Sequence, residues 1–303
     1  MTVRRNHNWL SQQNRDETLV GLLFVLPVLV GFLAFVAAPI ASTVALSFTS
    51  YDLFSPPQFV GLKNFVRMSA DARLWKVFGN TVFFTLWAVI GNTAVGVILA
   101  AVLNQKLPSA IKSVFRAAYF FPSLVGLIFV SIIWQFLYQR DIGVINYYLA
   151  LVGLGPIGWL SDPKVALVSV IILDVWKNAG FSMLIALAGL QGISSEYYEA
   201  ARIDGAGPVR TFVSITLPLL SPTILFLVTT NTIGSFRVFE SIIVLTNGGP
   251  GDATRSLVMY IYETGFKAFK MGYASAISML LLGVVVLVTV LQFRFAKRWT
   301  FYE

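Results

Sequence analysis

The chain has 303 residues, of which 57% are hydrophobic and 12% charged, and its formal net charge is +8. A soluble domain carries roughly 25% charged residues, so this composition, with a mean hydropathy of +0.77, excludes a soluble domain and predicts an all-α polytopic membrane protein. The sequence has no cysteine and one histidine, His7 in the polar N-terminal segment. These counts exclude disulfides and a cysteine or histidine metal site. We expect the positive charge to meet anionic membrane lipid and no nucleic acid.

Six stretches are long and apolar enough for membrane helices, each of which needs about 20 residues. They are residues 18–38 (with a possible continuation towards Phe48), 78–103, 117–138, 165–190, 219–245 and 273–295. The first follows a basic N-terminus, as a secretory signal does. Its apolar run is longer than the 7 to 15 residues typical of a signal, so we interpret it as a retained helix.

The spans divide the chain into one membrane domain with short flanks. We predict an N-terminal tail over residues 1–17, a first helix with its outer loop over 18–74, a core over 75–295 and a C-terminal tail over 296–303. The sequence NGGPG that follows the fifth span is a strong turn signal. Lysine and arginine are only slightly more frequent on the side of the N-terminus, so charge alone leaves the orientation open.

Residues 194–222 form the longest segment between spans that is typical of structured helix. Ser194 or Ser195 is a suitable N-cap, and Gly205 or Gly207 can end the helix in a left-handed conformation. Pro208 suits the first position of a second short helix. The segment therefore predicts two short helices joined at a glycine, which offer a surface to another protein.

Charged residues inside the predicted spans mark a candidate site. Asp174 and Lys177 are three residues apart in the fourth span, and Arg237 and Glu240 are three apart in the fifth. That spacing puts each pair on one face of a continuous helix. Because a charge at the centre of a span costs roughly 2.5 to 3.5 kcal/mol, two interpretations stay open: each pair neutralises itself, or the pairs line a substrate path.

Aromatic and amide side chains accompany these charges. Aromatic faces suit the C–H face of a sugar ring, and amides suit its hydroxyls, although aromatic residues also pack between helices and amides also join them. The aromatic side chains are those of Trp176, Phe181, Phe236 and Phe239, and the amides those of Asn178 and Asn231. As residues of a substrate pathway we predict Trp176, Asn178, Phe236 and Glu240.

No Walker A, GxSxG or HExxH pattern occurs, so the sequence predicts no catalytic residue, no metal site and no ATP site in this chain. The 194–222 segment does match the pattern EAA-x3-G-x9-I-x-L-P at every defining position. The matching residues are Glu199, Ala200, Ala201, Gly205, Ile215, Leu217 and Pro218. The chain thereby resembles the permease subunits of bacterial type I ABC importers.

Further similarities extend over nearly the whole chain and indicate the carbohydrate branch, which includes maltose and glycerol-3-phosphate permeases. They are FVGLKNF at 59–65, GSF at 234–236 and LTNGGP at 245–250. Glu240 departs from the aspartate more usual in this family.

The resemblance implies a five-helix core preceded by one N-terminal helix, in the bacterial plasma membrane, with both termini cytoplasmic. It implies a second, homologous permease subunit, two ATPase subunits that use ATP and magnesium, and an extracytoplasmic solute-binding protein. The EAA segment would be the helix that couples to the ATPase. The implied cargo is a sugar or polyol. Two alternatives stay open: a permease for glycerol-3-phosphate or another non-sugar solute, and an ion-coupled secondary transporter.

Overall fold

The computed structural model describes residues 8–105 and 107–300, with side chains from residue 17 onward. The regular secondary structure of the described chain is helical apart from one short antiparallel pair of strands, β1 (Thr49–Ser50) and β2 (Gln58–Phe59). This confirms the predicted all-α class. The predicted tails fall partly outside the described residues, at 1–7 and 301–303.

Four helical segments of the described chain are long and apolar enough to cross a membrane, or six if each of two bent pairs counts as one span. The first segment, residues 17–47, joins α1 (Asn8–Phe32), the π-helical turn η1 (Leu33–Ala37) and α2 (Ala38–Ser47). The others are α4 (Ala72–Asn104), α8 (Ala166–Gln191) and α15 (Met271–Ala296). These four match the first, second, fourth and sixth predicted spans, and α4 starts inside the predicted first-helix segment.

The third and fifth predicted spans are present, but neither is a single straight helix, because each contains a sharp bend between two helical segments. Helices α5 (Ser109–Leu124) and α6 (Leu127–Leu137) meet at an angle of 101°. Pro122 lies in the last turn of α5, and the two residues between the helices are extended or near-extended. The break itself falls at Val125 and Gly126, and glycine is a poor helix former.

The fifth span is interrupted at both ends. The segment Pro208–Leu219 is bent by 67° against α12 (Ser221–Ser235), and α13 (Glu240–Leu245) is separated from α12 by four non-helical residues. The prediction that Arg237 and Glu240 share one face of a continuous helix is therefore wrong, because Arg237 lies in the turn after α12.

The remaining helical elements are short. They are α3 (Lys63–Ala70), α7 (Val144–Leu151), α9 (Ser195–Ile203), α10 (Pro208–Thr211), η2 (Phe212–Thr216), α11 (Leu217–Leu219), α14 (Leu257–Tyr262) and η3 (Glu263–Lys267).

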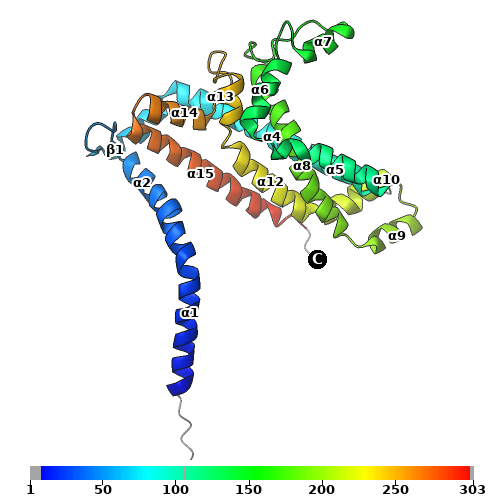
Figure 1. Ribbon diagram of the computed structural model, residues 1–303, viewed down its shortest axis with the longest axis horizontal. Helices are drawn as coiled ribbons and strands as arrows, with labels where there is room; N and C mark the ends of the chain where they lie inside the picture. The colour runs from blue at the N-terminus through cyan, green and yellow to red at the C-terminus, as the bar shows by residue number, and fades with distance from the viewer. Residues whose placement is uncertain (1–7, 106, 301–303) are drawn as a thin grey trace, which may run out of the picture.

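The bundle is centred on α4 and α8, which pack along much of their length (Figure 1). Helix α5 covers α8, and α12 lies against both α4 and α15. Small residues allow the close crossings: a Cβ at Gly96 would lie 2.5 Å from the Cβ of Ser182, and a Cβ at Gly180 would overlap the backbone oxygen of Tyr119. Such contacts between small residues are the usual way in which membrane helices approach each other.

The first span stands away from this bundle. Only its end near α2 packs against α15, and α1 extends alone from the body (Figure 1). None of its most apolar window is buried within the chain. This helix therefore presents its apolar side chains to lipid or to another subunit.

Candidate functional site

The segment 194–222 forms the exposed helix pair predicted from its sequence. The Ser194 hydroxyl accepts a hydrogen bond of 3.3 Å from the backbone N–H of Glu196 and so caps α9. Gly205 adopts a φ of +73°, in the left-handed region that favours glycine. Pro208 occupies the first turn of α10. The N-cap at Ser194, the left-handed turn at Gly205 and the start of α10 at Pro208 confirm the prediction of two short helices joined at a glycine.

The seven motif residues divide into an outward group and an inward group. Glu199, Ala200 and Gly205 are exposed, and a Cβ at Gly205 would meet no atom within 4 Å. Ala201 is buried on the inner side of α9. The outward group is therefore free to contact another molecule, whereas Ala201 fixes the helix to its own chain.

The inward group continues to the membrane helices. Leu217 packs against the buried cluster that contains Met183 and Leu220. Pro218 accepts a hydrogen bond on its carbonyl from the Ser221 hydroxyl at the start of α12. Ile215 is half-buried in η2. These residues join the exposed pair to the bundle at the start of α12.

Large apolar side chains are uncovered at the tip of this pair. Ile203 is 87% exposed and Val209 is 76% exposed, on either side of the Gly205 turn. Uncovered apolar side chains that cluster beside polar ones are typical of a protein–protein contact. In Figure 1 α9 and α10 lie at the end of the bundle opposite α14.

A cavity of about 1000 Å³ lies between α4, α5, α8 and α12. Its polar lining comes from six helices, α4, α5, α8, α12, α13 and α15, and from the turn after α12. The lining includes Asn92, Asp174, Asn178, Asn231, Arg237 and Glu240. The aromatic rings of Phe120, Phe181 and Phe239 also border it. The cavity thus combines hydrogen-bonding groups with apolar ring faces.

Two amides hold the carboxylate of Asp174. The Asn92 side-chain amide donates a hydrogen bond of 2.9 Å to one carboxylate oxygen, and the Asn178 amide donates one of 3.0 Å to the other. Lys177 instead donates to the backbone oxygen of Ser123 at 3.3 Å. No ion pair joins Asp174 and Lys177 in the part of the chain that the structure describes. The hydrogen bonds of the Asp174 carboxylate therefore come from two amides and not from a cation in contact with it.

A second polar layer lies deeper between the helices. The amide of Asn231 donates to the hydroxyls of Thr93 and Ser182, each at 3.3 Å, and so connects α12 to α4 and α8. The side-chain oxygen of Asn92 is buried and has no hydrogen-bond partner among the described residues. A buried unpaired acceptor is costly, and here it lies on a residue that borders the cavity.

The structure brings together only part of the predicted substrate pathway. Asn178 and Glu240 border the polar cavity. Trp176 lies on another side of α8, with its ring centre 5.4 Å from that of Trp134, beside an apolar hollow. Phe236 is 4% exposed and borders an apolar hollow between α4 and α12.

Sequence reasoning missed Asn92, which supplies one of the two amides that bind Asp174. A signal was available, because Asn92 is an amide within the long apolar run of α4. Polar residues inside a span face protein or water by default. Its partner lies 82 positions away in the chain, so only the tertiary structure identifies it.

A second polar cluster holds the opposite end together. Asp71 caps α4 by accepting from the Leu74 N–H, and it also accepts from the hydroxyls of Tyr260 (2.8 Å) and Tyr273 (2.7 Å). Burial opposes ionisation of this carboxyl, but these hydrogen bonds outweigh it and hold the pKa of Asp71 below its ordinary value. The cluster fixes the start of α4 against α14 and α15.

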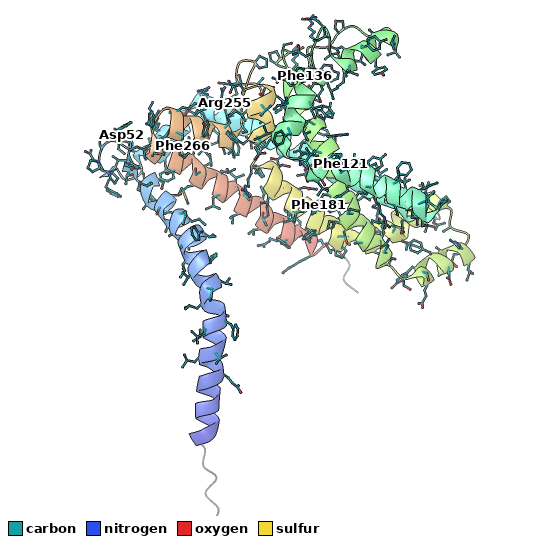
Figure 2. The ribbon with its side chains drawn as sticks, viewed as in Figure 1. Asp52, Phe121, Phe136, Phe181, Arg255 and Phe266 are labelled. Atoms are coloured by element: carbon teal, nitrogen blue, oxygen red, sulfur yellow. The ribbon has the colours of Figure 1, made fainter. Side chains whose placement is uncertain are left out.

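Ion pairs fix the turn that follows α13. Arg73 at the start of α4 contacts Asp252 at 2.8 Å, and Arg255 contacts both Asp252 and Glu263. Figure 2 shows Arg255 at the same end of the molecule as Asp52 and Phe266. Asn247 and Gly248 have positive φ values, which confirms the predicted turn.

The fold and the cavity define a polytopic helical membrane protein with a polar compartment between its helices and an exposed contact surface at one end. The chain belongs to the family of binding-protein-dependent transport system inner membrane components, which residues 92–301 match. This result confirms the family that the EAA pattern indicates. Solved structures that resemble this chain also have the type I importer permease fold.

Similar proteins include several permeases of ABC transporters. The probable ABC transporter permease protein YesP of Bacillus subtilis (strain 168) is 38% identical over 97% of this chain and 95% of its own. The trehalose/maltose transport system permease protein MalF of Thermococcus litoralis is 35% identical over 96% of this chain and 98% of its own. A crystal structure of a bacterial ABC transporter that imports the acidic polysaccharide alginate shares the fold, with a TM-score of 0.82 and 23% identity over 97% of this chain and 100% of that chain.

Proposed function

We propose that this chain forms the translocation pathway of an ATP-driven importer for a sugar or related polyol, and that it receives the energy of ATP hydrolysis through α9. The observation that carries the proposal is the complete EAA pattern on an exposed helix pair whose far end leads into a membrane helix. The ATPase is a separate subunit, and ATP and magnesium bind there.

The exposed pair supplies the features that a coupling contact requires. Ala200 is small, so a partner can approach the helix closely, and Ile203 and Val209 offer apolar area to bury. Glu199 offers an exposed carboxylate to donors on the ATPase. The inward residues Leu217 and Pro218 connect this contact to α12, which borders the cavity.

The cavity supports a polyhydroxylated cargo. Asn178 and Asn231 offer both donors and acceptors, as a sugar hydroxyl does, and Phe120 and Phe181 offer faces for the C–H groups of a sugar ring. The similarity to permeases named for trehalose, maltose and lactose supports the same substrate class.

A phosphate ester such as glycerol-3-phosphate is the second candidate, because Arg237 borders the cavity with its side chain exposed. Uptake of a neutral sugar and of the phosphate ester by the same complex would separate the two.

The remaining subunits follow from the same proposal. A second homologous permease would close the cavity, and an extracytoplasmic solute-binding protein would deliver the cargo opposite α9. Both termini of this chain are then cytoplasmic, in the bacterial plasma membrane. An ion-coupled transporter would need neither the ATPase nor the binding protein.

The cysteine-free sequence allows a direct test. Ala200→Cys introduces one thiol on the exposed face of α9, and Ser161→Cys introduces one in an exposed loop beyond α7 as the matched control. In membranes that contain the whole complex, we expect a short bifunctional reagent to cross-link only Ala200→Cys to the ATPase. Uptake in proteoliposomes should require ATP. Cross-linking from both sites, or uptake driven by an ion gradient without ATP, would contradict the proposal.

A further inference from the structure

The ends of three membrane helices meet at the end of the molecule opposite α9. The Asn64 amide donates to the backbone oxygens of Ser47 (2.8 Å), the last residue of α2, and Thr49 (2.9 Å), and so ties α3 to the first span. The Gly272 N–H at the start of α15 donates to the Tyr51 oxygen at 3.2 Å. Asp71, directly before α4, accepts from Tyr273 of α15. Because three spans begin or end here, this region lies at one boundary of the membrane.

Helix α3 packs against α15 in this region and leaves apolar side chains uncovered. Phe59 before the helix is 80% exposed, Leu62 is 63% exposed and Val66 is 68% exposed. Lys63 and Arg67 are exposed on the same short helix. A helix with apolar side chains on one face and basic ones on another is typical of the interface between headgroups and acyl chains. We call this the α3 surface.

A small polar pocket opens beside the α3 surface. It has a volume of about 240 Å³, and its lining includes Arg67 of α3, Arg73 of α4, Lys270 before α15, and the rings of Tyr260 and Tyr273. The guanidinium carbon of Arg67 lies 4.2 Å from the centre of the Tyr273 ring. That contact orients the guanidinium, so the cation is held in place rather than free in solvent.

The pocket carries positive charge that its own carboxylate does not neutralise. Arg73 is paired with Asp252 and lies 3.9 Å from Glu263, the acidic residue of the lining, which also contacts Arg255 and Lys267. Neither Arg67 nor Lys270 forms an ion pair within the described residues. Two cations therefore face one pocket at the membrane boundary and lack an anionic partner from this chain.

We propose that this pocket binds the phosphate headgroup of an anionic phospholipid, with the acyl chains lying along Phe59, Leu62 and Val66. Phosphate oxygens match the donors of Arg67 and Lys270, and the uncovered apolar side chains give the acyl chains a surface to cover. The position at the ends of three spans favours a lipid over a docked protein, because a headgroup is already present at that depth. Lipid binding at this pocket would not depend on which solute is transported.

The test measures lipids retained by the full chain. The protein is purified from mixed micelles that contain phosphatidylglycerol and phosphatidylcholine in equal amounts, and the bound lipids are counted by native mass spectrometry. We expect wild type to retain phosphatidylglycerol preferentially. Since each basic residue near a membrane surface contributes about fivefold in affinity for anionic lipid, Arg67→Ala with Lys270→Ala should lower that retention by at least about tenfold. Phosphatidylcholine retention should not change.

The matched control is Arg140→Ala, which removes one exposed positive charge outside the pocket. It should retain lipid as wild type does. Lys270→Gln alone keeps the proposal testable if the double variant does not fold, because Lys270 is exposed. Equal retention by wild type and Lys270→Gln would overturn the proposal, as would an equal loss in Arg140→Ala.

Two further arms separate other ligands from a phospholipid. Displacement of the bound lipid by inorganic phosphate at millimolar concentration would show that the site recognises free phosphate, and would overturn the lipid assignment. Unchanged lipid retention together with weaker binding of a solute-binding protein to the Arg67→Ala and Lys270→Ala variant would show that the surface docks a protein instead.

Discussion

Substitutions at Gly205 can distinguish two effects. One is the strain of a left-handed backbone, and the other is a clash with a partner that lies close to this turn. The φ of +73° at Gly205 is unfavourable for most side chains, and a Cβ at this position would meet nothing within 4 Å in the isolated chain. The left-handed conformation costs an ordinary L-residue roughly 1 to 2 kcal/mol, and asparagine adopts it more readily. Replacing Gly205 therefore costs free energy only at one exposed turn of this chain. A chain with another residue at this position should still fold.

The assembled importer should respond differently. If α9 and its glycine turn enter a pocket on the ATPase, the side chain of Gly205→Asn meets that partner even though its own chain leaves it free. We expect Gly205→Asn and Gly205→Asp to lower transport by at least tenfold, which corresponds to about 1.4 kcal/mol, while the protein still inserts. Gly205→Ala adds a smaller side chain at a higher backbone cost, so it should lose less.

The assay is ATP-dependent uptake by the reconstituted complex, with the amount of co-purified ATPase as a second readout. Gly153 provides the matched control, because its φ is +79° and a Cβ there would also meet nothing within 4 Å. Gly153→Asn should transport normally. Normal uptake by Gly205→Asn would refute the close approach. Loss in Gly205→Ala with full activity in Gly205→Asn would show that only the backbone conformation matters.

Three further predictions concern the bundle. Asp71→Asn should lower the free energy of unfolding by roughly 2 kcal/mol, because it removes charge-assisted hydrogen bonds. Since folding lowers the pKa of Asp71, the stability that its carboxylate contributes is full above the ordinary pKa of 3.8 and is lost as pH falls through the folded pKa. The melting temperatures of wild type and variant should therefore converge in acid and stay separate between pH 6 and 8. Gly180→Ala should destabilise the protein by roughly 1 to 3 kcal/mol, because its Cβ would overlap the backbone of α5. Gly234→Ala, with open space around it, should melt at the wild-type temperature. Equal melting temperatures of the two variants would contradict a tight crossing of α5 and α8. Asn178→Ala should raise the KM for uptake about tenfold and Trp176→Ala should not, because only Asn178 borders the polar cavity; the reverse result would place the pathway on the other side of α8.

The predicted spans rest on a constraint that is local in sequence. Because lipid offers no hydrogen-bond partners, a crossing segment must be a long apolar helix, and four of the six predicted segments are continuous helices in the structure. The caps of α9 and the turn at Gly205 are equally local, since Ser194 and the glycine act on neighbouring backbone groups. The EAA spacing indicated the family for the same reason: all its positions lie within one short segment.

The residues that line the cavity could not be predicted from short-range patterns in the sequence. Asp174 and Asn178 share a face because they are four residues apart, whereas Trp176 is two residues from Asp174 and points roughly 200° away around the helix. Proximity in sequence therefore grouped an aromatic residue with a site that it does not line. Asn92 reaches Asp174 from another helix, a contact that no pattern within one span predicts.

The sequence by itself determined the membrane class, most of the spans and the exposed helix pair of residues 194–222, because each follows from apolar length or from short-range backbone geometry. Only the tertiary structure decided where the third and fifth spans break and which polar residues share a compartment. Those features depend on how α4, α5, α8 and α12 cross, and the crossings are set by contacts between residues far apart in the chain, such as Gly180 with Tyr119.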